Sequence, residues 1–591
     1  MSIPYIVRVH PGSIAVLHAF LSVLLGGERA SGSARAEPRV EPRVRYSVEY
    51  RPHEDGSWLA VRLEATLDPA ARDVELYLPN QGEWVEIDSL YLRAFRSDPP
   101  ARRNPDSPGR WTIESPSGWD GSLEVSYTIP MIDIDSSAGR RYGLLPWEAR
   151  RDGAPPYGAA TSLNTLMIVT AAGTPVAAEV TLAAPPPYSV ASGWGGLAGH
   201  TQTFAADPLE ESPLLFGVAP RHAARTAAGV ACEVAQLSAG PDITGELLDQ
   251  AAGLADAFAR TTGVPLSRAL RIFVTDKGGG QRVERGLWMQ AVSEGGENSP
   301  YYKHLMAHEL FHEWLGGMAK PADESTIWFT EGFTEYLSLW HMVATGQASP
   351  EWFAQRIGEL NEAARASSAY GQVAFADPGV GWRDWDGPNE TLAYKGGAVL
   401  AFALDAELRQ SDGVRLPVMI ADLARAGEPY TLESIRAWLE GHGMAEFYAA
   451  HIAAPALPVW TEVLESTGFA IVEREAPLAY IGLRSDGDTY LGQILAIDPE
   501  GPAAALGLSI GEQITGLWPV RNPRPGISPL LTTEYRFGLD LASPDAEQVN
   551  LGVTGPAGER TVQISPRRVL CGRIQSIEPG ERAAEFFQLP D

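Results

Sequence analysis

Residues 308–312 read His-Glu-Leu-Phe-His and form the group in this sequence that is best suited to chemistry. On a helix, imidazoles at positions i and i+4 project from one face, so both can bind a single metal ion at roughly 2.0–2.1 Å. Glu309 lies about 100° around the helix from His308, where its carboxylate can take a proton from water on the open side of the metal. This spacing predicts hydrolysis by water activated on zinc.

We predict a third ligand at Glu331, in the run Trp328-Phe329-Thr330-Glu331-Gly332-Phe333 of a predicted helix over Ile327–Val343. Three protein ligands leave the fourth tetrahedral position for water, which is typical of catalytic zinc. We therefore expect one Zn²⁺ per chain, held by His308, His312 and Glu331. His304 lies one turn before His308, but a fourth protein ligand would close the water position, so we interpret it as a packed or solvent-facing histidine.

The elements that position these ligands carry their own signals. Ser299-Pro300 supplies a capping hydroxyl and a proline at the first helical position, and Gly316-Gly317 supplies the stop. Glu335 lies one turn after Glu331 on the same face, where it could accept the second ring proton of a ligand histidine and fix its tautomer. A surface glutamate is the alternative interpretation of Glu335.

Tyr394 is a candidate for stabilising a transition state. It lies in the early turns of a predicted helix that Asn389 could cap. A phenol is a suitable donor for the tetrahedral oxyanion that forms beside a catalytic zinc ion. By spacing alone, an ordinary half-buried tyrosine is the simpler interpretation.

These residues together resemble the glycyl aminopeptidase family, the thermolysin-like gluzincins that carry a C-terminal PDZ domain. The resemblance is carried by His308, Glu309, His312, Glu331 and the element Tyr394-Lys395-Gly396. It implies zinc binding by the two histidines and Glu331, a general base at Glu309 and oxyanion stabilisation by Tyr394. It extends over most of the chain.

The sequence departs from this family at one strand. In the family, a strand before the zinc helix reads Gly-Gly-Leu-Glu-His-Arg, and its acid lies near the free amino terminus of the substrate. We align it with residues 286–293, so that Gly286, Leu287 and Trp288 are expected to bind substrate and Trp288 replaces the acid. This replacement predicts altered recognition of the substrate amine with hydrolysis intact. Three nearby acids could bind the substrate amine instead of the missing family acid: Glu284, Glu294 and Glu297.

Composition and patterning predict a multidomain protein. The 591 residues are 45% hydrophobic and 20% charged, which is ordinary globular composition with room for three or four domains. Strict alternation, as in residues 44–50, predicts an N-terminal antiparallel β-sandwich over residues 37–225. Helical patterns predict a mainly helical, thermolysin-like α+β catalytic domain over residues 226–470.

Residues 471–591 are expected to form a PDZ domain and tail. Residues 501–514 look like the turn-helix-strand segment of PDZ domains in bacterial proteases, and a carboxylate-binding loop is expected at Tyr480, Ile481, Gly482 and Leu483. Backbone amides of such a loop can hold the C-terminus of a peptide that adds a strand to the sheet edge. Binding of a peptide and structural bracing of the catalytic domain both remain open.

The first 36 residues are predicted to be a secretory signal peptide. Arg8 and His10 precede an apolar run over residues 14–25, and Ala34-Arg35-Ala36 offers a cleavage site. The apolar run is too short and too interrupted for a comfortable membrane span, so we expect no stable span after cleavage. A secreted or periplasmic location follows, and a retained N-terminal anchor is the alternative.

Charge and cysteine content exclude several classes of protein. A formal net charge of −28 makes nucleic acid and anionic membrane surfaces poor partners, since both select basic patches. The sequence has two cysteines, Cys232 and Cys571, and no disulfide framework or cysteine metal site can be argued from them.

We therefore expect a zinc metallopeptidase, aminopeptidase-like in ancestry, that acts on a peptide or protein substrate. A zinc endopeptidase of the same fold is one alternative. A non-catalytic PDZ protein that binds peptides or serves as a scaffold is another, but the intact ligands and the intact Glu309 argue against it.

Overall fold

The computed structural model describes most of the chain beyond residue 42. The described residues are 43–53, 56–71, 74–78, 93–104, 109–133, 146–151, 154–171, 174–206, 210–237, 241–275, 281–290, 300–380, 382, 388–411, 413–480, 482–485, 493–518, 548–556, 558–565, 567–580 and 582–589. The predicted signal peptide lies outside them. Two compact units are present: Met1–Asp256 with Pro265–Leu310, and Ala257–Val264 with Phe311–Asp591.

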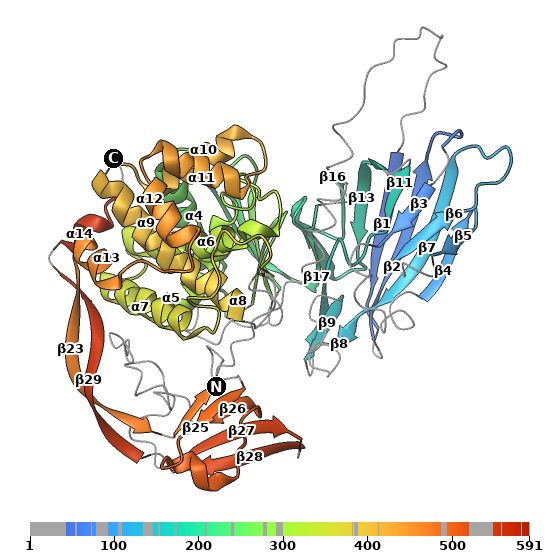
Figure 1. Ribbon diagram of the computed structural model, residues 1–591. Helices are drawn as coiled ribbons and strands as arrows, with labels where there is room; N and C mark the ends of the chain where they lie inside the picture. The colour runs from blue at the N-terminus through green and yellow to red at the C-terminus, as the bar shows by residue number, and fades with distance from the viewer. Residues whose placement is uncertain are drawn as a thin grey trace. The chain divides into compact units, whose positions relative to one another are not determined.

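The first unit begins with three β-sheets (Figure 1). The first sheet has the order β16 (Thr201–Ala206), β13 (Ala178–Ala183), β1 (Arg43–Arg51), β2 (Trp58–Thr66), β7 (Ser122–Pro130), β4 (Arg93–Asp98). The second has the order β15 (Gly196–Ala198), β14 (Tyr188–Ser192), β17 (Pro213–Val218), β10 (Ala154–Thr161), β9 (Trp147–Arg151), β8 (Ile132–Asp133). The third has the order β12 (Thr174–Pro175), β11 (Ile168–Ala171), β3 (Val74–Tyr77), β6 (Arg110–Ile113), β5 (Ala101–Arg103).

A shared hydrophobic core holds these three sheets together. Alternate residues of β1 are buried, as the sequence pattern predicts, and Val48, Leu76 and Phe216 bring side chains from three different sheets into one cluster. The predicted β-rich N-terminal region is therefore confirmed, but its details differ from a simple antiparallel sandwich. β1 pairs with β13 in parallel, because more than a hundred residues of intervening chain allow the crossover that a parallel pair requires.

A fourth sheet in the first unit precedes, in the sequence, the helix that carries His308 and Glu309. Its order is β18 (Arg221–Ala227), β19 (Val230–Gln236), β20 (Leu270–Thr275), β22 (Gly286–Gln290), β21 (Gln281–Val283). β19, β20 and β22 are parallel neighbours, and α4 (Thr244–Thr262) lies in the crossover between β19 and β20. β21 runs antiparallel to β22 and forms the edge of the sheet. Helix α5 (Pro300–Phe311) follows β22 in the sequence.

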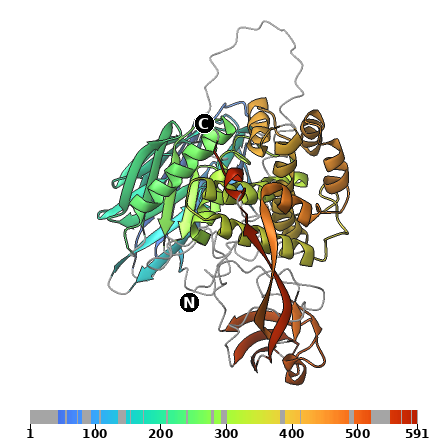
Figure 2. The ribbon, with the colours of Figure 1, turned by 90° about the vertical axis from the view of Figure 1, so that its left-hand side faces the viewer.

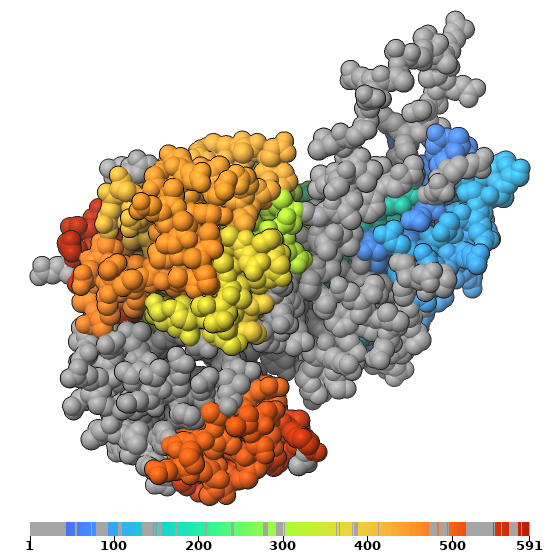
Figure 3. All heavy atoms as spheres, in the orientation of Figure 1, coloured from blue at the N-terminus to red at the C-terminus, as the bar shows by residue number. Residues whose placement is uncertain are grey.

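The second unit is built mainly from helices, as the sequence predicts. Beyond η4 (Glu324–Thr326) they are α6 (Ile327–Ala344), α7 (Pro350–Ala366), α8 (Pro388–Thr391), η5 (Leu392–Gly396), α9 (Gly397–Ser411), α10 (Leu416–Ala426), α11 (Leu432–Gly441), α12 (Ala445–Phe447), η6 (Tyr448–Ile452) and α13 (Trp460–Thr467). Helix α6 is buried on nearly all sides, so it forms the centre of the bundle. In the space-filling view, the orange atoms of α10 to α12 form one continuous surface (Figure 3).

The C-terminal part leaves and rejoins this bundle through a two-stranded ribbon of β23 (Phe469–Tyr480) and β29 (Arg567–Pro579), which Figure 2 shows as a long twisted pair. Between them lie a pair of strands, a short helix and a three-stranded sheet: β24 (Leu483–Ser485), β25 (Ile494–Ile497), η7 (Pro502–Leu506), β26 (Gln513–Trp518), β27 (Val549–Gly555) and β28 (Gly558–Ile564). Their small core includes Leu483, Ile494 and Val553. Ile481 of the expected carboxylate loop lies outside the described residues, and the PDZ assignment stays a prediction.

None of the helices in the described part of the chain combines the length and the apolar character that crossing a membrane would require.

A terminal helix, α14 (Ala583–Phe586), is fastened to the bundle by buried polar and aromatic contacts. The carbonyl oxygen of Phe586 accepts hydrogen bonds from Trp340 Nε1 at 2.9 Å and from Arg409 Nη1 at 2.7 Å. Arg409 is itself held by Asp405, which also accepts from the hydroxyl of Tyr336 at 2.6 Å. The ring of Phe586 packs against the Arg409 guanidinium. These contacts attach α14, which follows the ribbon strand β29, to helices α6 and α9.

Replacing Phe586 with alanine should therefore destabilise the second unit. The side chain is 7% exposed, and removing a buried phenylalanine ring typically costs about 3–5 kcal/mol. Thermal and urea unfolding should show a lower midpoint for Phe586→Ala, while Val418→Ala, on an exposed position of α10, should change stability by about 0.5 kcal/mol or less. Equal midpoints for the two variants would mean that the terminal helix adds nothing to the bundle.

Candidate metal centre

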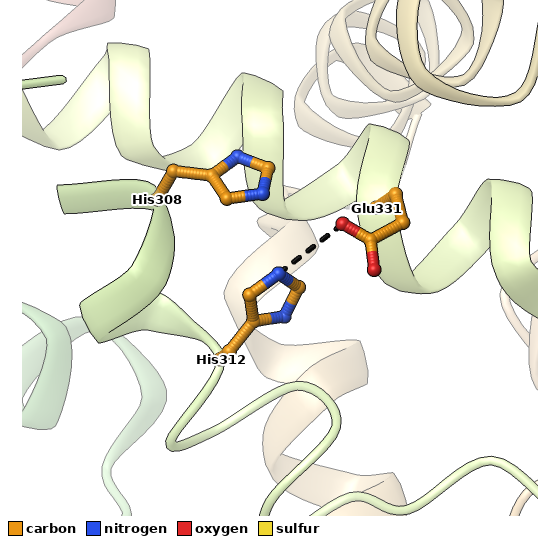
Figure 4. A group of neighbouring side chains, drawn as sticks. All are labelled: His308, His312 and Glu331. Carbon is orange, nitrogen blue, oxygen red and sulfur yellow. Dashed lines mark ion pairs between the residues drawn. The ribbon is translucent and has the colours of Figure 1, made fainter. Parts of the chain in front are cut away.

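His308, His312 and Glu331 come together in the structure as the sequence predicts. One possible ligand atom from each residue lies within 4.8 Å of the others, and among the described residues this is the group of histidine, cysteine and acidic side chains that could hold a metal ion. Both imidazoles reach toward the Glu331 carboxylate, which projects from α6 (Figure 4). The histidines are buried and Glu331 is half-buried. These donors match a three-ligand zinc site.

The orientation of the His312 ring is set by the backbone turn that follows α5. Its Nδ1 lies 3.0 Å from the carbonyl oxygen of Leu315, which can only accept a hydrogen bond, so Nδ1 carries the proton. Its Nε2 lies 3.2 Å from a carboxylate oxygen of Glu331. Two electron-pair donors that point at each other repel unless a cation or a proton lies between them. This arrangement fits a metal ion bound through Nε2.

Helix α6 holds Glu331 by burying the residues on both sides of it. Phe329 and Phe333 pack against each other with ring centroids 4.4 Å apart. The hydroxyl groups of Thr330 and Tyr430 lie 2.6 Å apart and are buried. Burial raises the pKa of the Tyr430 phenol well above its usual value, and the nearby carboxylate of Glu331 adds to this rise. The neutral phenol of Tyr430, through its contact with Thr330, therefore holds the first turn of α6 in place beside Glu331.

Glu309 is held by a contact that the sequence did not indicate. One oxygen of its carboxylate, Oε2, accepts a hydrogen bond from the backbone amide of Arg282 at 2.7 Å. Arg282 is the central residue of the edge strand β21 and pairs with Leu287 of β22. In an antiparallel pair, amides that do not face the partner strand point away from it, so the edge of the sheet supplies this donor. The contact orients one carboxylate oxygen of the expected general base.

Tyr394 lies in η5, a π-helical turn between α8 and α9. Such turns are rare and are frequently found at functional sites. The helix begins at Pro388, so Asn389 lies inside its first turn and is not its cap. The tyrosine is half-buried. Its expected role beside the metal ligands stays a prediction.

The turn that carries Tyr394 is brought close to α6 by two glycines. A Cβ atom on Gly332 would lie 2.4 Å from the Cα atom of Gly397 and 2.8 Å from the carbonyl oxygen of Ala393. A Cβ on Gly397 would lie 2.5 Å from the carbonyl oxygen of Trp328. No other residue type fits at either position without moving a backbone, and Gly332 directly follows Glu331.

The positions of Glu335 and His304 can be compared with the expectations. Glu335 is buried and lies 3.7 Å from the guanidinium of Arg356 on α7, so it forms part of a buried ion pair and is not a surface glutamate. Its action on a ligand histidine stays a prediction. His304 is also buried, with its ring centroid 6.4 Å from that of His308, and it is not part of the group that could hold a metal.

The structure gives Gly286, Leu287 and Trp288 a different setting from the one expected. β22 lies between β20 and β21, and its residues Leu287 and Trp288 pair with both neighbouring strands. The Trp288 indole is 2% exposed, donates to Thr275 Oγ1 at 2.8 Å and packs in an apolar cluster with Phe273. The assignment of these three residues to substrate binding gains no support from this arrangement. The edge strand beside Glu309 is β21.

Sequence reasoning missed several residues that support the site. Arg282 contacts Glu309, and Leu315 contacts His312, through backbone atoms. Every residue type has these atoms, so the sequence gives no indication of either contact. Tyr430 lies a hundred residues from its partner Thr330. The two glycines Gly332 and Gly397 do leave a signal, because glycine is unfavourable inside helices and its presence there indicates a close contact.

The sequence matches no protein-family model, and no curated protein matches it. Among solved structures, an aminopeptidase N family protein from Idiomarina loihiensis has a TM-score of 0.66 at 14% sequence identity, and the match covers 93% of this chain and 100% of that one. An M1 zinc metallopeptidase from Deinococcus radiodurans has a TM-score of 0.46 at 15% identity, covering 71% of this chain and 95% of that one. The first likeness shows that this chain shares the multidomain fold of an aminopeptidase N family protein.

Removing any one of the three converging side chains should abolish metal binding. Purified protein should contain about one zinc ion per chain, because three ligands and one open position describe a single catalytic-type site. Elemental analysis after dialysis should show that His308→Ala, His312→Ala and Glu331→Ala each lose it. His304→Ala is the matched control and should retain the metal. Full retention by all three ligand variants would rule out this site.

Proposed function

We propose that this protein is a zinc-dependent metallopeptidase that hydrolyses peptide bonds. The observation that carries this proposal is the convergence of His308, His312 and Glu331, with Glu309 adjacent to the first histidine on α5. The fold shared with an aminopeptidase N family protein supports it. The narrower likeness to glycyl aminopeptidases rests on the sequence motifs alone and is part of the proposal.

The proposed division of labour follows from the contacts of each residue. Zinc, when bound by the two histidines and Glu331, supplies a water of lowered pKa and polarises a substrate carbonyl. Glu309, with one oxygen held by the Arg282 amide, receives the proton of the attacking water and passes it to the leaving amine. The phenol of Tyr394 donates to the oxyanion. Glu335, paired with Arg356, holds a ligand histidine in its metal-binding tautomer.

Recognition of the substrate amine is proposed to differ from that of the family. Trp288 lies at the position aligned with the family acid and has no carboxylate. Its indole is buried in the core and donates a hydrogen bond to Thr275. Aminopeptidase and endopeptidase activity of the same site are therefore both candidates. We further propose a secreted or periplasmic location, and a C-terminal PDZ domain that binds a peptide or braces the catalytic domain. A non-catalytic scaffold is the remaining alternative.

Conservative changes at Glu309 and Tyr394 should separate chemistry from metal binding. Glu309→Gln should retain zinc and be nearly inactive, because an amide cannot accept the proton of water. Tyr394→Phe should lower kcat by roughly 10²–10³ with little change in KM, as for the loss of one oxyanion donor. The measurement is hydrolysis of a peptide library with and without chelator, followed by kinetics on one cleaved peptide. Tyr370→Phe, on a half-buried tyrosine that contacts Arg365, is the matched control.

Wild-type turnover by Tyr394→Phe would return this tyrosine to a packing role, and wild-type turnover by Glu309→Gln would exclude the proposed function.

Acetylation of the substrate amine should be tolerated. A free amine that finds no carboxylate loses solvation without compensation, so blocked and free peptides should be cleaved at comparable rates. The measurement is kcat/KM for one peptide with a free and with an acetylated N-terminus. A preference for the free amine above about a hundredfold, roughly 2.7 kcal/mol, would show that an acid such as Glu284 binds the amine.

A further inference from the structure

The turn between β21 and β22 consists of Glu284 and Arg285, and it is docked on the segment that precedes β17. The backbone amide of Glu211 donates to the Glu284 carboxylate at 2.9 Å. In return, the backbone amide of Arg285 donates to the carbonyl oxygen of Glu211 at 3.0 Å. The guanidinium of Arg285 forms an ion pair with the carboxylate of Glu210. Both residues of the turn are therefore held by backbone and side-chain contacts.

The surroundings of this turn are themselves rigid. A Cβ atom on Gly193 would lie 2.1 Å from the carbonyl oxygen of Arg285, so the two backbones touch. Ser162 and Ser212 are joined through their backbones at 2.9 Å, and the Ser162 hydroxyl accepts from the Ser212 amide at 2.9 Å. The segment that receives the turn is thus tied to the end of β10. A turn held in this way has little freedom to shift.

Strand β21 has only three residues, so the position of the docked turn also sets the position of the residue that contacts Glu309. Val283 adjoins the turn, and Arg282, one residue further back, donates its amide to the Glu309 carboxylate. β21 is an edge strand and has one strand neighbour, β22, in its sheet. Its distance from α5 therefore depends on the register with β22 and on the anchorage of the turn.

We propose that Glu211 and Arg285 are positioning residues for the reaction, because they anchor the β21–β22 turn and so hold the Arg282 amide against the carboxylate of Glu309. This proposal rests on the proposed function for the catalytic meaning of Glu309. The anchorage itself is a property of the first unit, and it can be measured without substrate.

The state of the Glu211 side chain gives this anchorage a dependence on pH. Burial, together with the neighbouring charge of Glu284, raises the pKa of Glu211 from its ordinary value of 4.5 to about 8, against a smaller opposing effect of the Thr161 hydroxyl. Among the described residues, the charged side chains that contact this segment include those of Glu284 and Arg285, and Glu210 lies within the segment. Docking of the turn therefore favours the protonated form of Glu211.

The direction of the pH effect follows from proton linkage. The charge of Glu284, a residue of the turn, adds to the raised pKa of Glu211 when the turn is docked. The docked form therefore binds this proton more tightly than the undocked form, and docking weakens as the pH rises toward about 8. Above about pH 8 both forms are ionised, and the effect levels off.

Hydrogen exchange of the full-length protein tests the proposal. Amide exchange in residues 281–290, corrected for the intrinsic rate at each pH, should be faster at pH 8 than at pH 6 in the wild type. Glu211→Gln keeps a neutral side chain of the same shape, so its corrected exchange should be the same at both pH values. Glu75→Gln, which removes an ion-paired carboxylate of β3, is the matched control and should behave like the wild type.

Variants of Arg285 connect the anchorage with the reaction. Arg285→Ala should speed exchange in residues 281–290 at both pH values and should lower kcat by roughly tenfold with little change in KM. Arg285→Lys retains the positive charge beside Glu210 and should restore part of both effects.

Two outcomes would overturn the proposal: equal pH dependence of exchange in the wild type and in Glu211→Gln, or wild-type kcat in an Arg285→Ala protein whose exchange is faster. If no peptide is hydrolysed by any form while the exchange results hold, the proposed function fails and the anchorage stands.

Discussion

The convergence of three electron-pair donors is the constraint on which the rest of the site depends. His308, His312 and Glu331 bring their ligand atoms within 4.8 Å of one another in a largely buried setting. A cation bound between these atoms would offset the repulsion between their lone pairs. The fold must hold the three side chains in this arrangement. It does so with aromatic packing on both sides of Glu331 and with the carbonyl oxygen of Leu315 on His312.

Close backbone contact is the second device that assembles the site. Gly332 and Gly397 let α6 approach the π-helical turn that carries Tyr394, and the same approach would be blocked by a single methyl group. Gly193 plays a similar part beside the β21–β22 turn. In each case a residue with no side chain lies next to a residue with a proposed role, so the glycines decide which neighbours can meet.

The edge strand of the fourth sheet in the first unit contacts Glu309. β22 is an inner strand whose tryptophan fills the core, while β21 presents the Arg282 amide to the carboxylate of Glu309. The strand expected to face the substrate and the strand that faces Glu309 are thus different members of one hairpin. Their short connecting turn is anchored on the segment before β17, which links residues of the β-rich region to the position of an expected general base.

The sequence by itself determined the three side chains of the candidate metal site, the helices that carry them and the change from β-rich to helical structure, because helical spacing and alternation are local properties of the chain. His308 and His312 share a face through their spacing, and α6 is found over the predicted residues. The tertiary structure alone decided the parallel pairing of β1 with β13, the inner position of β22 and the partners of Glu309, Glu335 and Tyr430. These contacts join residues far apart in the chain, several through backbone atoms common to all residue types, so no local pattern of side chains could specify them.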